Sequence, residues 1–204
     1  MSLPIFVVDA FVADEPFTGN PAAVCVMPAE ESEAVGVEDR LQGIAAEMNL
    51  SETAFVSPLE DGELPSTWSL RWFTPGDEVE LCGHATIAAA HALRERGLAP
   101  AEDPITFRTR HRGDLIQTRV DGLEEVGLPA TPLQEIADPD PRLFEGLGTE
   151  PGRVVRTMED DLVLVLEDGA LIEAMRPDMR VLGGVKAIGI AVTSLLRGTR
   201  ISQR

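Results

Sequence analysis

The sequence predicts an α+β fold in which a curled sheet surrounds one apolar helix. Short β-rich runs separated by turn residues recur along the first 128 residues, and such runs are typical of short strands. Among them lies the segment 83–93, which is small or apolar on nearly every side and therefore predicts a helix buried all round. With 204 residues, 44% of them hydrophobic, the chain can form one large domain or two small ones with cores of their own.

The first elements follow from apolar runs between turn residues. Residues 4–11 predict a strand, Pro16–Pro21 is dense in turn residues, and residues 22–27 predict the second strand. An amphipathic helix follows, ended by Asn49. Its apolar face is formed by residues at helical spacing, namely Val37, Leu41, Ile44, Ala45 and Met48.

The rest of the first half alternates strands with the apolar helix. Further strands are predicted at residues 53–57, 68–73, 105–110, 115–120 and 125–128. Thr74–Asp77 turns the chain back toward residues 79–81. The central helix is placed at residues 83–96, since Gly97 follows its polar last turn as a stop signal.

A boundary between two half-domains is predicted after residue 128. Residues 129–141 are acidic and contain four prolines, which separates a first half-domain, 1–128, from a partial second one, 129–194. In the second half we expect strands at 162–167 and 187–193 and a short helix at 170–175. Residues 195–204 are basic and polar without a pattern, and we expect an unrelated or disordered tail.

Composition and charge exclude several classes of protein. Cys25 and Cys82 are the only two cysteines, too few for a disulfide scaffold or a four-cysteine zinc site. No apolar run approaches the roughly 20 residues of a membrane span, and no basic segment precedes an apolar core at the N-terminus. We therefore expect a cytoplasmic protein with no membrane partner.

The net charge of −18 repels phosphate backbones. The nearest basic cluster runs from Arg108 to Arg112 and contains no interleaved aromatic residues. We therefore expect no nucleic-acid partner.

Polar residues at the start of the apolar helix predict a binding site for a carboxylate. The first N–H groups of a helix have no partner within it and carry partial positive charge, and Gly83 lets an anion approach them closely. An alternative is that Gly83 and His84 only begin a core helix, with His84 as its cap.

Two further side chains are candidates for proton transfer. Glu52 stands at the mouth of an apolar strand, where a carboxylate is suited to give and take protons near neutral pH. The alternative interpretation of Glu52 is a charged residue at a strand edge with no role in chemistry. Cys82 precedes a helix start, a setting that lowers the pKa of a thiol and makes it reactive. The alternative interpretation of Cys82 is a small buried hydrophobic residue, which is what we expect for Cys25.

Motifs for cofactors are absent from the sequence. It contains no H-E-x-x-H metal motif, no phosphate-binding Walker loop, no G-x-G-x-x-G dinucleotide fingerprint and no G-x-S-x-G nucleophile elbow. We therefore expect neither a metal nor a cofactor.

Five motifs in register resemble the PhzF family of phenazine-biosynthesis-like isomerases. They are Asp9-Ala10-Phe11, the segment 17–24, Asn49-Leu50-Ser51-Glu52-Thr53, Phe73-Thr74-Pro75 and Leu81-Cys82-Gly83-His84-Ala85-Thr86. The resemblance covers residues 4–120 and continues more loosely through 162–167, 176–178 and 187–193.

This resemblance implies a diaminopimelate-epimerase-like fold. Two pseudo-symmetric halves would each wrap a curled, mostly antiparallel sheet around a central helix, with the active site between them. The family works without metal or cofactor, often as a homodimer, and its best-studied member moves a proton on the ring of a dihydro-hydroxyanthranilate. A small-molecule carboxylate is the substrate class that this implies.

The resemblance also assigns roles to individual residues. Glu52 matches the general acid/base, and His84 matches the histidine near the substrate. Gly83 and Ala85 match the backbone that holds the substrate carboxylate, and Asn20 lies in the turn that lines the site. Cys82 is the position at which related epimerases carry a catalytic cysteine, so it is included among the substrate-binding residues.

The resemblance ends at the C-terminus. Family members continue after the segment resembling 190–193 into a Glu-Asp-Pro-x-Thr-Gly-Ser-Ala-like motif that opens a second central helix, and residues 195–204 do not resemble it. We expect the second half to be incomplete. Two alternatives to a PhzF-like isomerase therefore stay open: an inactive remnant or carboxylate-binding module, and an epimerase that depends on Cys82. The second half has no cysteine, which disfavours a two-thiol mechanism.

Overall fold

The computed structural model describes residues 3–13, 18–32, 34–59, 65–130, 132–158 and 160–194. The predicted tail, 195–204, and part of the predicted turn at 16–21 lie outside these residues. The chain separates into two compact units, one ending at Pro129 and the other beginning at Ala130. Each unit has its own sheet and its own hydrophobic core.

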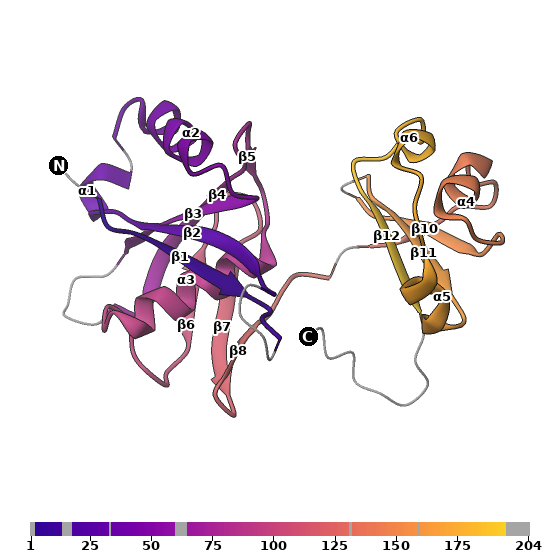
Figure 1. Cartoon of the computed structure of the whole chain (residues 1–204). Helices are drawn as coiled ribbons and strands as arrows, with labels where there is room; N and C mark the ends of the chain where they lie inside the picture. The colour runs from indigo at the N-terminus through magenta and orange to yellow at the C-terminus, as the bar shows by residue number, and fades with distance from the viewer. Residues whose placement is uncertain are drawn as a thin grey trace. The chain divides into compact units, whose positions relative to one another are not determined.

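The first unit contains an eight-stranded sheet (Figure 1). Its strands are β1 (Ile5–Ala10), β2 (Asn20–Val26), β3 (Glu52–Pro58), β4 (Thr67–Phe73), β5 (Glu78–Val79), β6 (Ile105–Arg108), β7 (Asp114–Val120) and β8 (Leu123–Val126). The order is β1-β2-β3-β4-β6-β7-β8, with β5 paired to β4. Neighbouring strands are antiparallel except for β2 with β3 and β4 with β6. The strands predicted for this half are therefore present, although β5 ends two residues before the predicted segment does.

Helix α3 (Gly83–Glu95) packs inside the curl of this sheet against β1, β2, β3 and β8 (Figure 1). Its alanines are almost completely buried, so the short side chains let the helix approach the strands closely. Gly97, with φ +63°, follows the last turn as predicted. The expectation of a sheet curled around one apolar helix is confirmed.

Helix α2 (Val37–Met48) covers the opposite face of the sheet. Val37, Leu41 and Ala45 are buried there, as the spacing predicts, and Asn49 ends the helix in a left-handed conformation with φ 50°. Because β2 and β3 lie between α2 and α3, they are buried on both faces and read as continuous apolar runs. Val24 packs toward α3, whereas Cys25 packs toward α2, so the expectation that Cys25 is a core residue is confirmed.

A buried polar network anchors the C-terminal end of α3. Arg94 donates hydrogen bonds to the side chains of Gln117 on β7 and Glu124 on β8, the latter at 2.7 Å. All three side chains belong to unit 1 and lie out of solvent, where an unmade hydrogen bond would be costly. The network therefore holds α3 in one position along the sheet.

The second unit contains a four-stranded sheet with the order β12-β11-β10-β9. Its elements are β9 (Gln134–Glu135), α4 (Pro141–Leu147), β10 (Arg153–Arg156), β11 (Leu162–Leu166), α5 (Gly169–Ala174), α6 (Met179–Leu182) and β12 (Ile190–Ser194). The predicted strands and short helix correspond to β11, β12 and α5. No element was predicted from the sequence at α4, β9, β10 or α6, nor at α1 (Ala29–Ser32) in the first unit.

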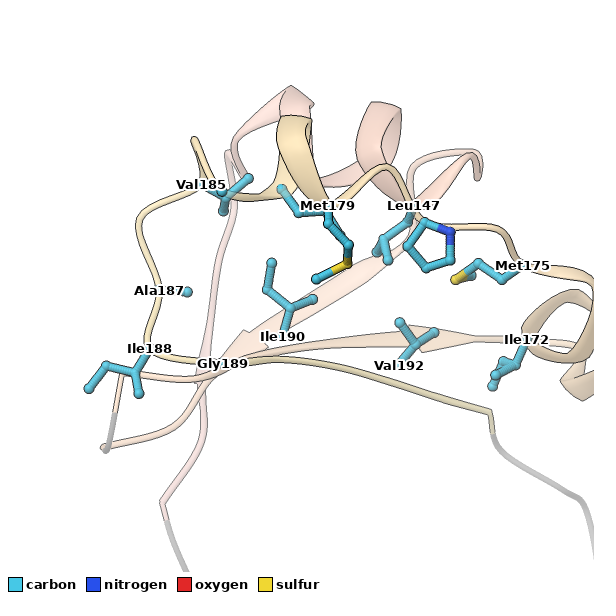
Figure 2. Close-up of a pocket in the computed structure, with 13 residues that line it drawn as sticks. Leu147, Ile172, Met175, Met179, Val185, Ala187, Ile188, Gly189, Ile190 and Val192 are labelled. Atoms are coloured by element: carbon cyan, nitrogen blue, oxygen red, sulfur yellow. The ribbon is translucent and has the colours of Figure 1, made fainter. Parts of the chain in front are cut away.

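An apolar groove of about 740 Å³ lies in the second unit between β12, α5 and the segment around α6 (Figure 2). Ile190 and Val192 of β12 form its floor, and Ile172, Met175 and Met179 lie around it. None of its thirteen lining residues carries a titratable side chain. The groove can bind apolar surface, but its walls supply no group for acid-base chemistry.

Candidate active site

The parallel pairing of β2 with β3 brings the predicted site residues together. In this pairing Ala22 lies opposite Glu52, so the two strands begin at the same edge of the sheet. Asn20 begins β2 at that edge, and α3 begins beside it at Gly83. Residues more than 60 positions apart in the chain therefore form one cluster.

Glu52 and His84 form the centre of this cluster. The Glu52 Oε2 atom lies 3.2 Å from Nε2 of His84, and the side chains are only 20% and 11% exposed. Although the two atoms are close, their alignment does not make a hydrogen bond, and Oε2 is a buried oxygen without a hydrogen-bond partner. Such an oxygen is costly to bury, so it is a candidate for a group that acts on a ligand.

Burial lowers the pKa of His84, and the nearby Glu52 charge opposes that shift only in part. The neutral imidazole is therefore the predominant form at neutral pH. In a neutral imidazole one ring nitrogen donates a proton and the other accepts one. His84 can thus exchange hydrogen bonds with groups on both sides of its ring.

Cys82 lies beside the other ring nitrogen of His84. Its Sγ atom is 3.3 Å from Nδ1 of His84, and the residue is 7% exposed. Burial, opposed by the backbone N–H groups of Ala85 and His84 and aided by the nearby Glu52 carboxylate, raises the pKa of the Cys82 thiol to about 12. Of the two interpretations that the sequence left open for Cys82, this environment favours the small buried hydrophobe over the reactive thiolate, because burial outweighs the effect of the helix start.

Ser51 belongs to the same cluster and was not among the predicted site residues. Its Oγ atom lies 3.3 Å from His84 Nε2 and 3.4 Å from both Asn20 Oδ1 and the carbonyl oxygen of Pro21. It therefore links the exposed Asn20 to the imidazole. Its place directly before Glu52, as a polar residue at the start of an apolar strand, is the signal that could have identified it.

The start of α3 has the features expected of a carboxylate-binding site. Cys82, at the N-cap, makes no side-chain capping hydrogen bond, so the N–H groups of Gly83, His84 and Ala85 have no partner within the helix. A methyl group on Gly83 would just touch Leu128, at 3.4 Å. Packing within the protein thus does not require glycine here, whereas close approach of a ligand to the backbone would.

The other histidines, Glu47 and the basic cluster lie away from this site. Glu47 and His111 are exposed, and His91 is half-buried on α3. The arginines of the basic cluster are paired with acids: Arg108 with Asp114, Arg110 with Glu38 and Glu78, and Arg112 with Glu80. This pairing neutralises the one basic cluster that the sequence offered for nucleic acid.

Three side chains of the cluster could hold a metal ion. One donor atom each from Glu52, Cys82 and His84 lie within 4.8 Å of one another, a grouping that linear motif spacing did not indicate.

Within the described part of the chain, none of the helices has the length and apolar character needed to cross a bilayer.

The sequence matches the PhzC-PhzF family, described as phenazine biosynthesis-like protein, over residues 8–200. The chain belongs to this family. It is 44% identical over 195 residues to an uncharacterized isomerase from Halalkalibacterium halodurans, a match that covers 95% of this chain and 68% of the relative. The resemblance inferred from the five motifs is confirmed.

Solved structures of PhzF proteins share the fold. A PhzF-family protein from Enterococcus faecalis superposes with a TM-score of 0.72 at 36% identity, covering 94% of this chain and 68% of that one. A predicted epimerase from Pseudomonas aeruginosa, 22% identical, superposes with a TM-score of 0.63 over 94% of this chain and 70% of its own. These neighbours confirm the predicted α+β, epimerase-like fold class.

Proposed function

We propose that this PhzF-family protein is an isomerase that moves a proton on a small carboxylate-bearing metabolite, with Glu52 as the general acid/base. The observation that carries the proposal is the buried, unpartnered Oε2 oxygen of Glu52 next to the start of α3. A carboxylate in such a position keeps an unsatisfied lone pair that can accept a proton. Relatives named as isomerases support the same reaction class.

The reaction follows from two properties of the cluster. The N–H groups at the start of α3 hold the substrate carboxylate, and Glu52 removes a proton from a nearby carbon. The electron pair of that C–H bond moves into the conjugated system of the substrate, and the same carboxyl group returns the proton to another carbon. No electrons are gained or lost overall, so the reaction proposed here needs no redox cofactor.

Neutral His84 and Ser51 orient this machinery. The imidazole contacts the Glu52 carboxylate through Nε2 and the Cys82 thiol through Nδ1, and Ser51 Oγ lies 3.3 Å from Nε2. We propose that His84 donates a hydrogen bond to the substrate or to Glu52 as the carboxylate gives up its charge. Asn20 would line the entrance, and Gly83 and Ala85 would contribute backbone N–H groups. Family membership also leads us to propose a homodimer, which light scattering would test.

The decisive experiment measures hydrogen exchange. Small carboxylates are incubated with the protein in D₂O, and deuterium incorporation at carbon is followed by NMR. Replacing Glu52 by Gln should lower the exchange rate by about 100-fold or more, because the amide cannot accept the proton. Glu47→Gln, on the exposed side of α2, is the matched control. Unchanged exchange in Glu52→Gln would show that Glu52 is structural.

A carboxylate-binding module is the second candidate function. The uncapped start of α3 and Gly83 both belong to the first unit, so a carboxylate can bind without any residue beyond Pro129. Thermal shifts on addition of small aromatic and amino acids, without exchange into any of them, would favour this reading. The thiol-dependent epimerase is disfavoured, because a thiol with a pKa of about 12 is protonated at neutral pH.

A further inference from the structure

The cluster at the start of α3 contains three donors of different kinds: a thiol, an imidazole and a carboxylate. Cys82 Sγ and His84 Nδ1 are 3.3 Å apart, and His84 Nε2 and Glu52 Oε2 are 3.2 Å apart. The proposed proton transfer uses the carboxylate and assigns no step to the thiol. The buried thiol of Cys82, beside an imidazole, therefore has no role in the proposed reaction.

The separations are close to those of a tetrahedral metal site. Ligand atoms about 2.0–2.3 Å from a zinc ion are separated from one another by about 3.3–3.8 Å. The sulfur and Nδ1 already satisfy this relation, and one atom from each of the three residues lies within 4.8 Å of the other two. The Glu52 oxygen lies nearest the other ring nitrogen, Nε2, so the carboxylate must turn toward Sγ and Nδ1, and closing the widest separation in the cluster by about 1 Å would complete three-coordination.

Glu52 is the residue free to make that shift. Its Oε2 atom has no hydrogen bond to break, and it is buried against the same imidazole. Once Nδ1 faces the ion, Nε2 carries the ring proton and lies 3.3 Å from Ser51 Oγ, which can accept it. A ligating histidine is commonly held by such a hydrogen bond from its other ring nitrogen.

We propose that Cys82, His84 and Glu52 form a binding site for a thiophilic divalent cation such as Zn²⁺ or Cd²⁺. On binding, the thiol releases its proton to solvent, and thiolate and carboxylate together balance the charge of the ion. A sulfur and an imidazole select such cations over Mg²⁺ and Ca²⁺, which prefer all-oxygen sites. The net charge of −18 raises the local concentration of cations around the protein.

The site has a consequence for activity that rests on the proposed function. Because the ion would occupy Glu52 Oε2, the same oxygen could not accept a proton from a substrate. Bound Zn²⁺ would therefore inhibit isomerisation, and a substrate carboxylate at the start of α3 would compete with the ion.

The test is a titration of the reduced, metal-stripped full chain with Cd²⁺. We expect a thiolate-to-cadmium charge-transfer band in the ultraviolet that saturates at one ion per chain and is reversed by Zn²⁺ but not by Mg²⁺. Surface carboxylates do not produce this band, so the acidic surface does not obscure it. The band should vanish in Cys82→Ser and persist in Cys25→Ser, whose thiol lies on the α2 side of the sheet.

Two variants of the proposed ligands distinguish a three-residue metal site from metal binding by the Cys82 thiol alone. His84→Gln and Glu52→Gln should each weaken cadmium binding by about tenfold or more while the thiol remains. Full affinity in both variants, or no band in the folded wild-type chain, would overturn the proposal. If Cys82→Ser does not fold, these two variants still decide the question.

The metal readout is independent of catalysis. Cadmium binding together with unchanged hydrogen exchange in Glu52→Gln would leave the metal site standing and remove the proposed function. Loss of exchange in Glu52→Gln without any cadmium band would do the reverse.

Discussion

The two units of the chain solve the burial of a sheet in different ways. In the first, the thirteen-residue helix α3 lies against the concave face of the sheet and α2 covers the other face. In the second, the described helices α4, α5 and α6 have seven, six and four residues, and an apolar groove remains open beside β12.

As a result, the polar groups suited to acid-base chemistry lie in the first unit, and the open apolar groove lies in the second. Where α3 begins against the starts of β2 and β3, unpaired N–H groups, a carboxylate and an imidazole meet. The groove of the second unit, of about 740 Å³, has no titratable side chain in its lining. A long helix that begins at a sheet edge therefore supplies polar groups there, whereas the short helices around the apolar groove supply none to it.

The largest expected effect is a loss of stability confined to one unit, and it tests whether the two units unfold independently. Leu93→Ala on α3 and Leu164→Ala on β11 remove fully buried leucines from separate cores, each at a cost of about 2–5 kcal/mol. Hydrogen exchange read by mass spectrometry should show faster exchange only in the unit that carries the change. Equal acceleration in both units would mean that they unfold as one.

A smaller effect is expected from a methyl group at the start of α3. Gly83→Ala should weaken carboxylate binding about tenfold, or 1.4 kcal/mol, because the methyl group covers the N–H groups. Its single contact, with Leu128, predicts no loss of stability. Gly43→Ala, within α2 and with open space around it, is the control and should stabilise the helix by about 0.5–1 kcal/mol. Thermal shifts with and without ligand measure both quantities.

An ion pair in the first unit predicts a modest dependence of stability on pH. The Arg71 guanidinium donates two hydrogen bonds to Glu78, at 2.7 and 2.8 Å, and holds the pKa of that carboxyl below its usual value. A lowered folded-state pKa contributes stability above the unfolded pKa that is lost as the pH falls through the folded value. Glu78→Gln should therefore cost up to about 1 kcal/mol at pH 7 and nothing near pH 2. Denaturant unfolding at both pH values checks this, and an equal cost at both would contradict it.

The smallest effect concerns the two thiols. Burial raises the pKa of Cys25 to about 11 and that of Cys82 to about 12. Iodoacetamide at pH 7.5 should therefore leave both unmodified in the folded chain and modify both in denaturant, as mass spectrometry would show. Rapid alkylation of Cys82 alone would revive the thiol-dependent epimerase.

Elements with a strong local pattern could be predicted from the sequence. The spacing of Val37, Leu41 and Ala45 identified α2, and the run of alanines identified α3. Helix α4 was missed although Asp140 caps it, Pro141 begins it and Gly148 ends it. A helix of seven residues shows too little periodicity, and its single proline, with the three that precede it from residue 129 onward, is typical of a linker.

The family, the fold class and the residue types available for chemistry can be predicted from the sequence, because they depend on local patterns and on the order of motifs. Only the folded chain shows that burial raises the pKa of the Cys82 thiol, that Ser51 contacts His84 and that a buried, unpartnered oxygen of Glu52 lies beside His84. Burial and distance depend on strands and a helix that are far apart in the chain. The physical reason is that solvation of a side chain is set by everything packed around it, whereas a sequence motif records only its neighbours along the backbone.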